Sequence, residues 1–375
     1  MSAAPPGAGW RGHLQLDYRQ QAGRTIALDR HHGPLRVLQR LYPEGDAVCH
    51  QVLVHPPGGI VGGDELALDA TLAPGSHALI TTPGATKFYR SAGPLARQTV
   101  QADIGPGARL EWLPLETIAY NRCQAQNRLR FTLAAGAQML GWDVLALGLP
   151  AADAPFVDGC FDQQLLLPGV WREQGRIDGQ DRLLLDSPLG LAGHPVLATL
   201  WLAEAPGQAL GRERTETLID AARALIDASA LPSTAGVSAP AESLLVLRAL
   251  GHRVEPVMTL LQQVWAACWP SGWWASSSAR WCWRWPSACC RPGWPRPRRR
   301  RRPDRRPPAG RHRPPAPGGR VQAAPALRCA RPAAGRAPGP SAGCARPPTP
   351  VAAGSSPALP GGPVRAAPAA IQPVR

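Results

Sequence analysis

The chain has 375 residues and a formal net charge of +15 at pH 7, but this charge is unevenly distributed. Up to Trp265 there are 21 Lys and Arg against 25 Asp and Glu, whereas residues 266–375 carry 20 Arg and one acid, Asp304. The first part is mildly acidic, which argues against a nucleic-acid partner, and it is long enough for one large domain. We expect a flexible N-terminus over residues 1–9, a β-rich domain over 10–266 and a disordered Arg-, Pro- and Ala-rich tail over 267–375.

The N-terminus and the cysteines indicate the compartment. The opening MSAAPPGAGWRG has no basic region followed by an apolar one, so a cytoplasmic location is expected. The cysteines of the domain, Cys49, Cys123 and Cys160, are odd in number and widely spaced. They suggest neither a disulfide framework nor a zinc site.

The first 200 residues contain short segments in which apolar and polar residues alternate, which is the pattern of half-buried strands. Three of them are residues 13–20, 34–42 and 51–55. A unit of strand, tight turn with a glycine, and strand then recurs at residues 71–82, 103–114 and 132–143. The turn glycines are Gly75, Gly107 and Gly136. This period predicts stacked β-hairpins in a β-helix-like array or elongated sandwich, and the alternative is an ordinary antiparallel sandwich.

Two amphipathic helices are predicted near the end of the domain. Residues 212–228 place Leu218, Ala222 and Ile226 at helical spacing. After a strand-like segment at 243–250, a second helix is expected from about Glu255, with an apolar stripe of Val257, Met258, Leu261, Val264 and Trp265. The predicted fold class is therefore mainly β, with two C-terminal α-helices and a disordered tail.

The tail begins abruptly inside the second predicted helix and has three interpretations. It is an arginine-rich arm for nucleic-acid phosphates, a membrane segment over residues 257–279, or a stretch translated out of frame. The membrane segment is interrupted by Gln, Pro and Ser. A shifted frame in GC-rich DNA yields Arg, Pro, Ala, Gly, Trp and Cys, so the composition favours the third interpretation.

The segment from His50 to Ser91 is unusually rich in glycine and histidine. Its string GGIVGGD contains Gly58, Gly59, Gly62 and Gly63, but it lacks the endings and spacing of phosphate or dinucleotide loops. A structural tight turn that presents Asp64 is the favoured interpretation.

Candidate chemistry is sparse. Cys49, His50, His55 and Asp64 could hold a metal weakly and transiently, whereas the simpler alternative is a satisfied or surface histidine at each position. No GxSxG elbow or other nucleophile pattern is present. Lys87, the only lysine of the chain, is either an activated amine or a cation paired with a carboxylate, and the second is favoured.

Several long strings resemble one protein family. They are GPLRVLQRLYPEG at 33–45, CHQVLVHPPGGIVGGDEL at 49–66, TTPGATKFYRS at 81–91 and LEWLPLETIAY at 110–120. Together they resemble the UreD (UreH) family of urease accessory proteins over about residues 10–266. The chain departs from the family after the second helix, where a short terminus is replaced by the tail, so folding and docking of that helix are in question.

The resemblance implies a non-enzymatic chaperone for nickel insertion into urease. It implies binding to apo-urease and to UreF, and through UreF to the GTPase UreG, with nickel passed along an internal tunnel and no tightly bound cofactor. The carboxylates implied to contact nickel transiently are Asp64, Asp143 and, more weakly, Glu173, and the weak metal binding considered above adds His50 and His55. Those implied to shape the tunnel or a docking surface are Gly58, Gly59, Gly62, Gly63, Thr86, Lys87, Tyr89 and Arg90. The alternatives are a nucleic-acid-binding protein that uses the tail and, more weakly, an enzyme that uses Lys87 with Asp64.

The out-of-frame interpretation predicts a specific result in the coding DNA. A second reading frame past about codon 267 should encode a plausible short helix end followed by a stop codon. Resequencing the gene and translating its three forward frames over this region measures this directly. The interpretation would be refuted if neither of the other frames continued the helix before its first stop codon.

Overall fold

The computed structural model describes residues 9–269. The predictions for residues 1–8 and for the tail after residue 269 lie outside the described residues. Among residues 9–269 we find no helix with the length and apolar character needed to span a bilayer.

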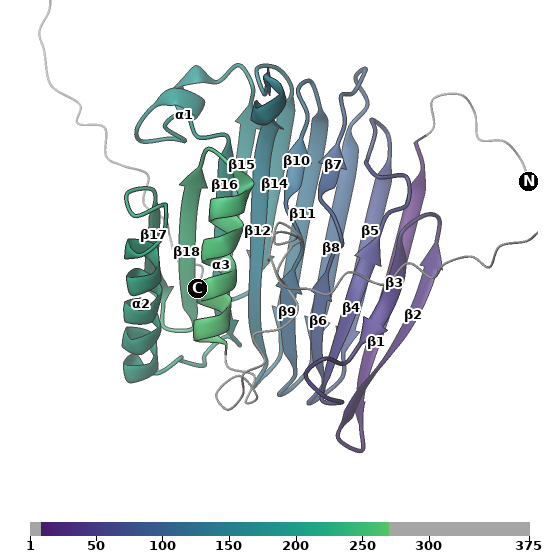
Figure 1. The fold of residues 1–375 in the computed structure, drawn as a ribbon. Helices are drawn as coiled ribbons and strands as arrows, with labels where there is room; N and C mark the ends of the chain where they lie inside the picture. The colour runs from purple at the N-terminus through teal and green to yellow at the C-terminus, as the bar shows by residue number, and fades with distance from the viewer. Residues whose placement is uncertain (1–8, 270–375) are drawn as a thin grey trace, which may run out of the picture. The chain divides into compact units, whose positions relative to one another are not determined.

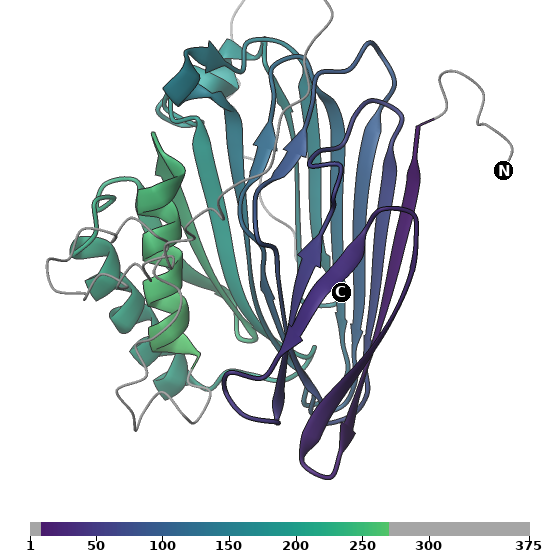
Figure 2. The same ribbon diagram turned by 45° about the vertical axis from the view of Figure 1, so that its right-hand side comes forward.

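The strands of the described region form two sheets that face each other (Figure 1, Figure 2). Sheet A consists, in spatial order, of β15 (Trp171–Asp178), β14 (Cys160–Leu167), β11 (Gln124–Leu133), β8 (Ala96–Ile104), β5 (Glu65–Leu72), β1 (Arg11–Gln21) and β2 (Arg24–His32). Sheet B consists of β17 (Ala235–Ala241), β18 (Leu244–Gly251), β16 (Val196–Glu204), β12 (Gln138–Leu149), β9 (Arg109–Leu113), β6 (His77–Thr81), β4 (Val48–Val54) and β3 (Arg36–Leu41). Three short strands extend sheet B: β10 (Thr117–Ala119) and β13 (Ala154–Pro155) pair with β12, and β7 (Thr86–Phe88) pairs with β10.

The helices lie near the C-terminal end of the described region. They are α1 (Arg182–Asp186), α2 (Arg212–Asp227) and α3 (Val254–Cys268), with a 3₁₀ turn at Pro150–Ala152. The two predicted helices are confirmed as α2 and α3. The short α1 and the 3₁₀ turn were not predicted, since neither is long enough to show a helical period. Figure 2 shows α2 and α3 on the outer side of sheet B.

The stacked, mainly β architecture is confirmed, but its units are arches and not hairpins. In each repeat the chain leaves sheet A at a turn and enters sheet B, as from β5 to β6, β8 to β9 and β11 to β12. Within each sheet the equivalent strands of successive coils pair in parallel. Both strands of a unit have one apolar face, and an arch lets these faces bury each other, which a flat hairpin cannot do.

The turns of successive arches are hydrogen-bonded to one another. Gly75 has φ +71° and donates its N–H to the carbonyl of Pro106 at 3.0 Å. Gly107 has φ +64° and donates in the same way to Ala135 at 3.1 Å. Glycine adopts this left-handed conformation without a steric penalty. The glycine repeat in the sequence therefore marks the corners of the stack.

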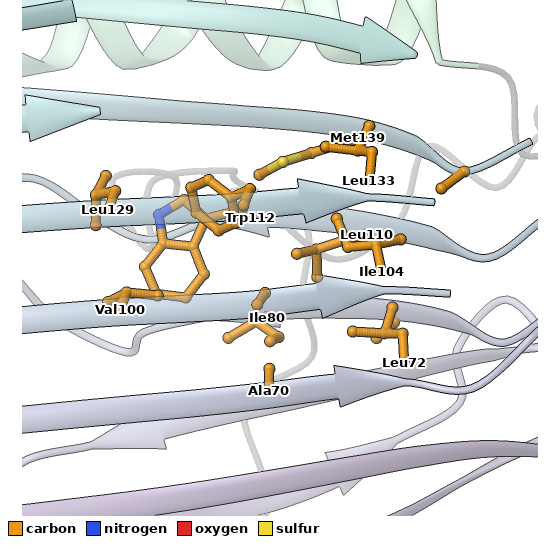
Figure 3. Packing of buried hydrophobic residues seen from close by; sticks show 14 of the residues in the cluster. Ala70, Leu72, Ile80, Val100, Ile104, Leu110, Trp112, Leu129, Leu133 and Met139 are labelled. Atoms are coloured by element: carbon orange, nitrogen blue, oxygen red, sulfur yellow. The ribbon is translucent and has the colours of Figure 1, made fainter. Parts of the chain in front are cut away.

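The main core lies between the two sheets (Figure 3). Ile104 has Leu72 and Leu133 as its in-register neighbours on β5 and β11, so the three form an apolar row across sheet A. They pack in one cluster with residues of sheet B such as Leu110 and Met139. Burial of this kind stabilises by about 25 cal/mol per Å² of apolar surface. A second cluster lies between the outer face of sheet B and the helices α2 and α3.

Helix α3 is held on sheet B by a buried carboxylate. Glu111 on β9 is 1% exposed and accepts a hydrogen bond from the indole Nε1 of Trp265 at 2.6 Å. Its other oxygen lies 2.8 Å from Nε2 of His77 on β6. A buried carboxylate requires such partners because water cannot reach it. The last helix is thus formed and docked in spite of the composition change next to it.

Replacing Trp265 tests whether its hydrogen bond to Glu111 anchors helix α3 on sheet B. Trp265→Phe keeps an aromatic ring but removes the donor to Glu111, so the free energy of unfolding should fall by about 1–3 kcal/mol. Urea denaturation followed by circular dichroism measures the change. The exposed neighbour Gln263→Ala serves as the control, with an expected effect within about 0.5 kcal/mol. Equal stability of Trp265→Phe and the wild type would contradict the anchor.

Candidate functional site

Sheet A carries a row of polar side chains that point between the sheets. Asn127 on β11 is the in-register neighbour of Gln98 on β8 and of Gln163 on β14. These residues share the inward face with Val100 and Leu129, because side chains alternate along a strand. Gln98 Nε2 donates to Asn127 Oδ1 at 3.2 Å, and Asn127 is 1% exposed. The row is therefore polar, with Asn127 buried at its centre and Gln98 and Gln163 partly buried on either side.

Sheet B contributes a carboxylate to this row. Gln163 Nε2 donates a hydrogen bond to the carboxylate of Asp143 on β12. We call Gln98, Asn127, Gln163 and Asp143 the polar layer. It separates the cluster of Figure 3 from a second inter-sheet cluster that includes Phe161, near the start of β14.

A cavity of about 270 Å³ adjoins the polar layer, and Gln98, Asn127 and Asp143 line it. Trp112 also lines it, and its indole nitrogen is buried without a hydrogen-bond partner among residues 9–269. Figure 3 shows this nitrogen on the side of the ring nearest Leu129. Because each water takes about 30 Å³ of liquid volume, the space suits several waters or a hydrated ion. A water in this cavity could accept a hydrogen bond from the indole N–H.

Asp143 is the ionisable group of the polar layer. Its pKa is raised from the ordinary 3.8 to about 6, chiefly because burial disfavours the charged form; the hydrogen bond from Gln163 lowers the pKa and the charge of Glu173 raises it, and the value of about 6 includes both effects. The group therefore changes charge close to neutral pH. Its ionised form offers an oxygen ligand to a cation, and a proton can take the place of the cation.

Part of the predicted site lines the cavity: His55, Gly58, Gly59, Thr86, Lys87 and Asp143. Burial lowers the pKa of His55, so its imidazole is neutral at pH 7 and can act as a ligand. A Cβ on Gly59 would stand 2.2 Å from the ring of Tyr89, so glycine is needed for that ring to pack.

The ion pair expected for Lys87 is not found. No carboxylate among residues 9–269 lies within ion-pair distance of its ammonium group. The physical reason is its position, because β7 places Lys87 in the cavity wall among neutral groups such as Thr86 and Thr117.

Other predicted site residues lie away from the cavity. The carboxylate of Asp64 accepts the backbone N–H groups of Trp10 at 2.8 Å and Val61 at 3.0 Å, so it closes the GGIVGGD turn. His50 lies on the face of β4 opposite the inter-sheet core, and its Nε2 is 2.8 Å from Glu44.

Glu173 lies at the edge of sheet A and is paired with Arg248. A search for three or more His, Cys, Asp or Glu grouped for a metal finds none among residues 9–269. The side chains implied to contact nickel are thus not gathered into one centre in the part of the chain that the structure describes.

The remaining predicted residues shape the loops around the turn. A Cβ on Gly62 would stand 2.2 Å from Oγ of Ser91, and Gly63 has φ +94°, so both positions require glycine. Tyr89 and Arg90 line a separate hollow. In this structure Gly62 and Gly63 allow close packing of the loops around the GGIVGGD turn.

Sequence reasoning missed Gln98, Asn127 and Gln163. A signal was present, because the inward phase of β8 and β11 follows from Val100 and Leu129 and places Gln98 and Asn127 on the same face. The inward position of Gln98 and Asn127 could therefore have been predicted from the sequence. Their neighbour in the other sheet, Asp143, could not.

The fold and site define a class of protein in which stacked coils form two facing sheets with a polar layer between them. Comparison with known sequences identifies the family. A model of the family described as "UreD urease accessory protein" matches residues 11–284. UreD of Leptothrix cholodnii is 64% identical over 260 residues, covering 69% of this chain and 93% of the relative. UreD of Paracidovorax citrulli is 55% identical over 258 residues, with coverage of 69% and 93%. The chain belongs to the UreD urease accessory protein family.

The raised pKa of Asp143 predicts a pH-dependent stability. Between about pH 4 and 6 the native state binds more protons than the unfolded state, so the wild type loses stability as the pH rises. Asp143→Asn lacks this loss and should be more stable than the wild type at pH 7.5 by about 2–3 kcal/mol, with no difference near pH 4. Urea denaturation across this range measures it, and the exposed Asp103→Asn is the control. If the difference in the free energy of unfolding between Asp143→Asn and the wild type were the same at all pH values, the raised pKa of Asp143 would be contradicted.

Proposed function

We propose that this chain is a non-enzymatic, cytoplasmic scaffold of urease maturation. It binds apo-urease and UreF, engages UreG through UreF, and carries nickel to the urease active site by way of its polar layer. Membership of the UreD urease accessory protein family supports the role in urease maturation. The observation that carries the nickel proposal is the polar layer with Asp143, which crosses an otherwise apolar interior beside a cavity.

The ligand chemistry of the layer suits a transient cargo. Asp143 offers one carboxylate, and Gln98 and Asn127 offer amide oxygens. Oxygen ligands hold nickel more loosely than thiolates or several imidazoles do. A protein that passes an ion on requires such weak and separated contacts. Nickel is in this proposal the cargo of the protein and not its resident cofactor.

Separating complex formation from metal transfer tests the proposal. The full chain should co-purify with apo-urease and UreF, and Asp143→Asn should do so equally well. The nickel content of urease matured with Asp143→Asn should fall severalfold, because the amide cannot become an anion. Asp143→Asn is expected to be the more stable protein, so misfolding does not explain a loss.

Inductively coupled plasma mass spectrometry of purified urease gives the nickel content, and Asp103→Asn is the matched control. Failure to bind urease or UreF would refute the scaffold. Normal nickel content with Asp143→Asn would refute the role of the layer. Salt-dependent binding to DNA that requires residues 267–375 would instead favour the nucleic-acid alternative.

A further inference from the structure

The polar layer reaches an edge of the two sheets that is closed by one ion pair. Asp143 on β12 is in register with Thr199 on β16, and Thr199 is in register with Arg248 on β18. Arg248 Nη2 donates to Glu173 Oε2 at 2.6 Å. Glu173 belongs to β15, the last strand of sheet A, so this contact joins sheet B to sheet A at the edge of the stack.

The edge strands have no side chain at this level. Gly175 on β15 stands opposite Gln163, and Gly236 on β17 stands opposite Arg248. A Cβ added to either glycine would meet no atom within 4 Å, and neither has a positive φ. Backbone geometry therefore does not require glycine at these positions. What the two glycines produce is open space where the polar layer meets the surface.

The ion pair is suited to opening. The side chains of Arg248 and Glu173 are 61% and 36% exposed, and exposed ion pairs contribute little stability. Glu173 is close enough to Asp143 for its charge to raise the pKa of that carboxyl. Glu173 is in register with Leu165 and lies on the same face of sheet A as Gly175, which is opposite Gln163, so its carboxylate lies beside the point where the polar layer reaches this edge. A divalent ion at Glu173 competes directly with the single charge of Arg248.

We propose that this edge is a portal of the polar layer and that Arg248 is the positioning residue that closes it by pairing with Glu173. The inference rests on the proposed function for the nature of the cargo, a divalent cation. Arrival of the cation at Glu173 displaces the guanidinium into solvent and opens the portal. Departure of the cation restores the ion pair.

Accessibility of the interior tests the portal without urease or nickel. Thr199→Cys in the full chain places a thiol behind Arg248, and a small trimethylammonium methanethiosulfonate reagent labels it. Peptide mass spectrometry distinguishes this cysteine from the native ones. Adding Arg248→Ala should speed labelling roughly fivefold, since a weak exposed ion pair no longer holds the edge closed. Arg248→Lys should restore slow labelling, which a merely structural loss would not do.

A larger side chain in the open space at this edge should have the opposite effect and slow the labelling. Gly175→Leu should slow labelling of the Thr199→Cys chain, both with Arg248 in place and in combination with Arg248→Ala. Gln174→Leu, on the outer face of the same strand, should not slow it. Urea denaturation of each variant confirms that it is folded. Labelling that is insensitive to both Arg248→Ala and Gly175→Leu would overturn the portal.

The two proposals can fail separately. If the chain does not bind apo-urease or UreF while labelling responds as described, the proposed function fails and the portal stands. If the complex forms and labelling does not respond, the portal fails alone. If both proposals hold, Gly175→Leu should lower the nickel content of urease severalfold while the complex still forms. Gln174→Leu should leave the nickel content unchanged.

Discussion

In-register parallel pairing of the arched coils is the constraint on which the rest of the structure depends. Each coil repeats the same path through both sheets, so residues at one level form a continuous row across the strands. The row through Ile104 is apolar and builds the core, and the row through Asn127 is polar and builds the layer. A shift of one residue at a turn would move every side chain of a strand to the other face. The hydrogen-bonded corners at Gly75 and Gly107 prevent such a shift.

The polar layer carries an energetic cost that the fold only partly offsets. Buried amides and carboxylates are unfavourable unless they are hydrogen-bonded, and two such bonds are made within the layer, from Gln98 to Asn127 and from Gln163 to Asp143. The indole N–H of Trp112 still lacks a partner among the described residues. Replacing buried polar groups by well-packed aliphatic ones is often neutral or stabilising in proteins. Retaining polar groups there is consistent with a charged occupant of the interior.

The sequence was enough to predict the period of the turn glycines, the alternating strands and the two amphipathic helices. Helix α3 is formed even though the change in composition next to it made its folding uncertain. The arches could not be predicted, because strand–turn–strand units look alike whether the two strands pair with each other or enter different sheets. The motif residues near Gly59 and Lys87 were found at the cavity wall. The carboxylate of Asp64 accepts two backbone N–H groups in a turn, and its place beside a metal path stays a prediction.

The sequence by itself determined the corners, the strand faces and the helices, because these follow from residues a few positions apart. It also determined the family, because long strings of residues are shared with relatives. Only the tertiary structure decided that Gln163 meets Asp143 and that Arg248 reaches Glu173, seventy-five positions away. Such contacts arise when two sheets close on each other, and the register of the whole stack, which no local pattern contains, selects which side chains meet.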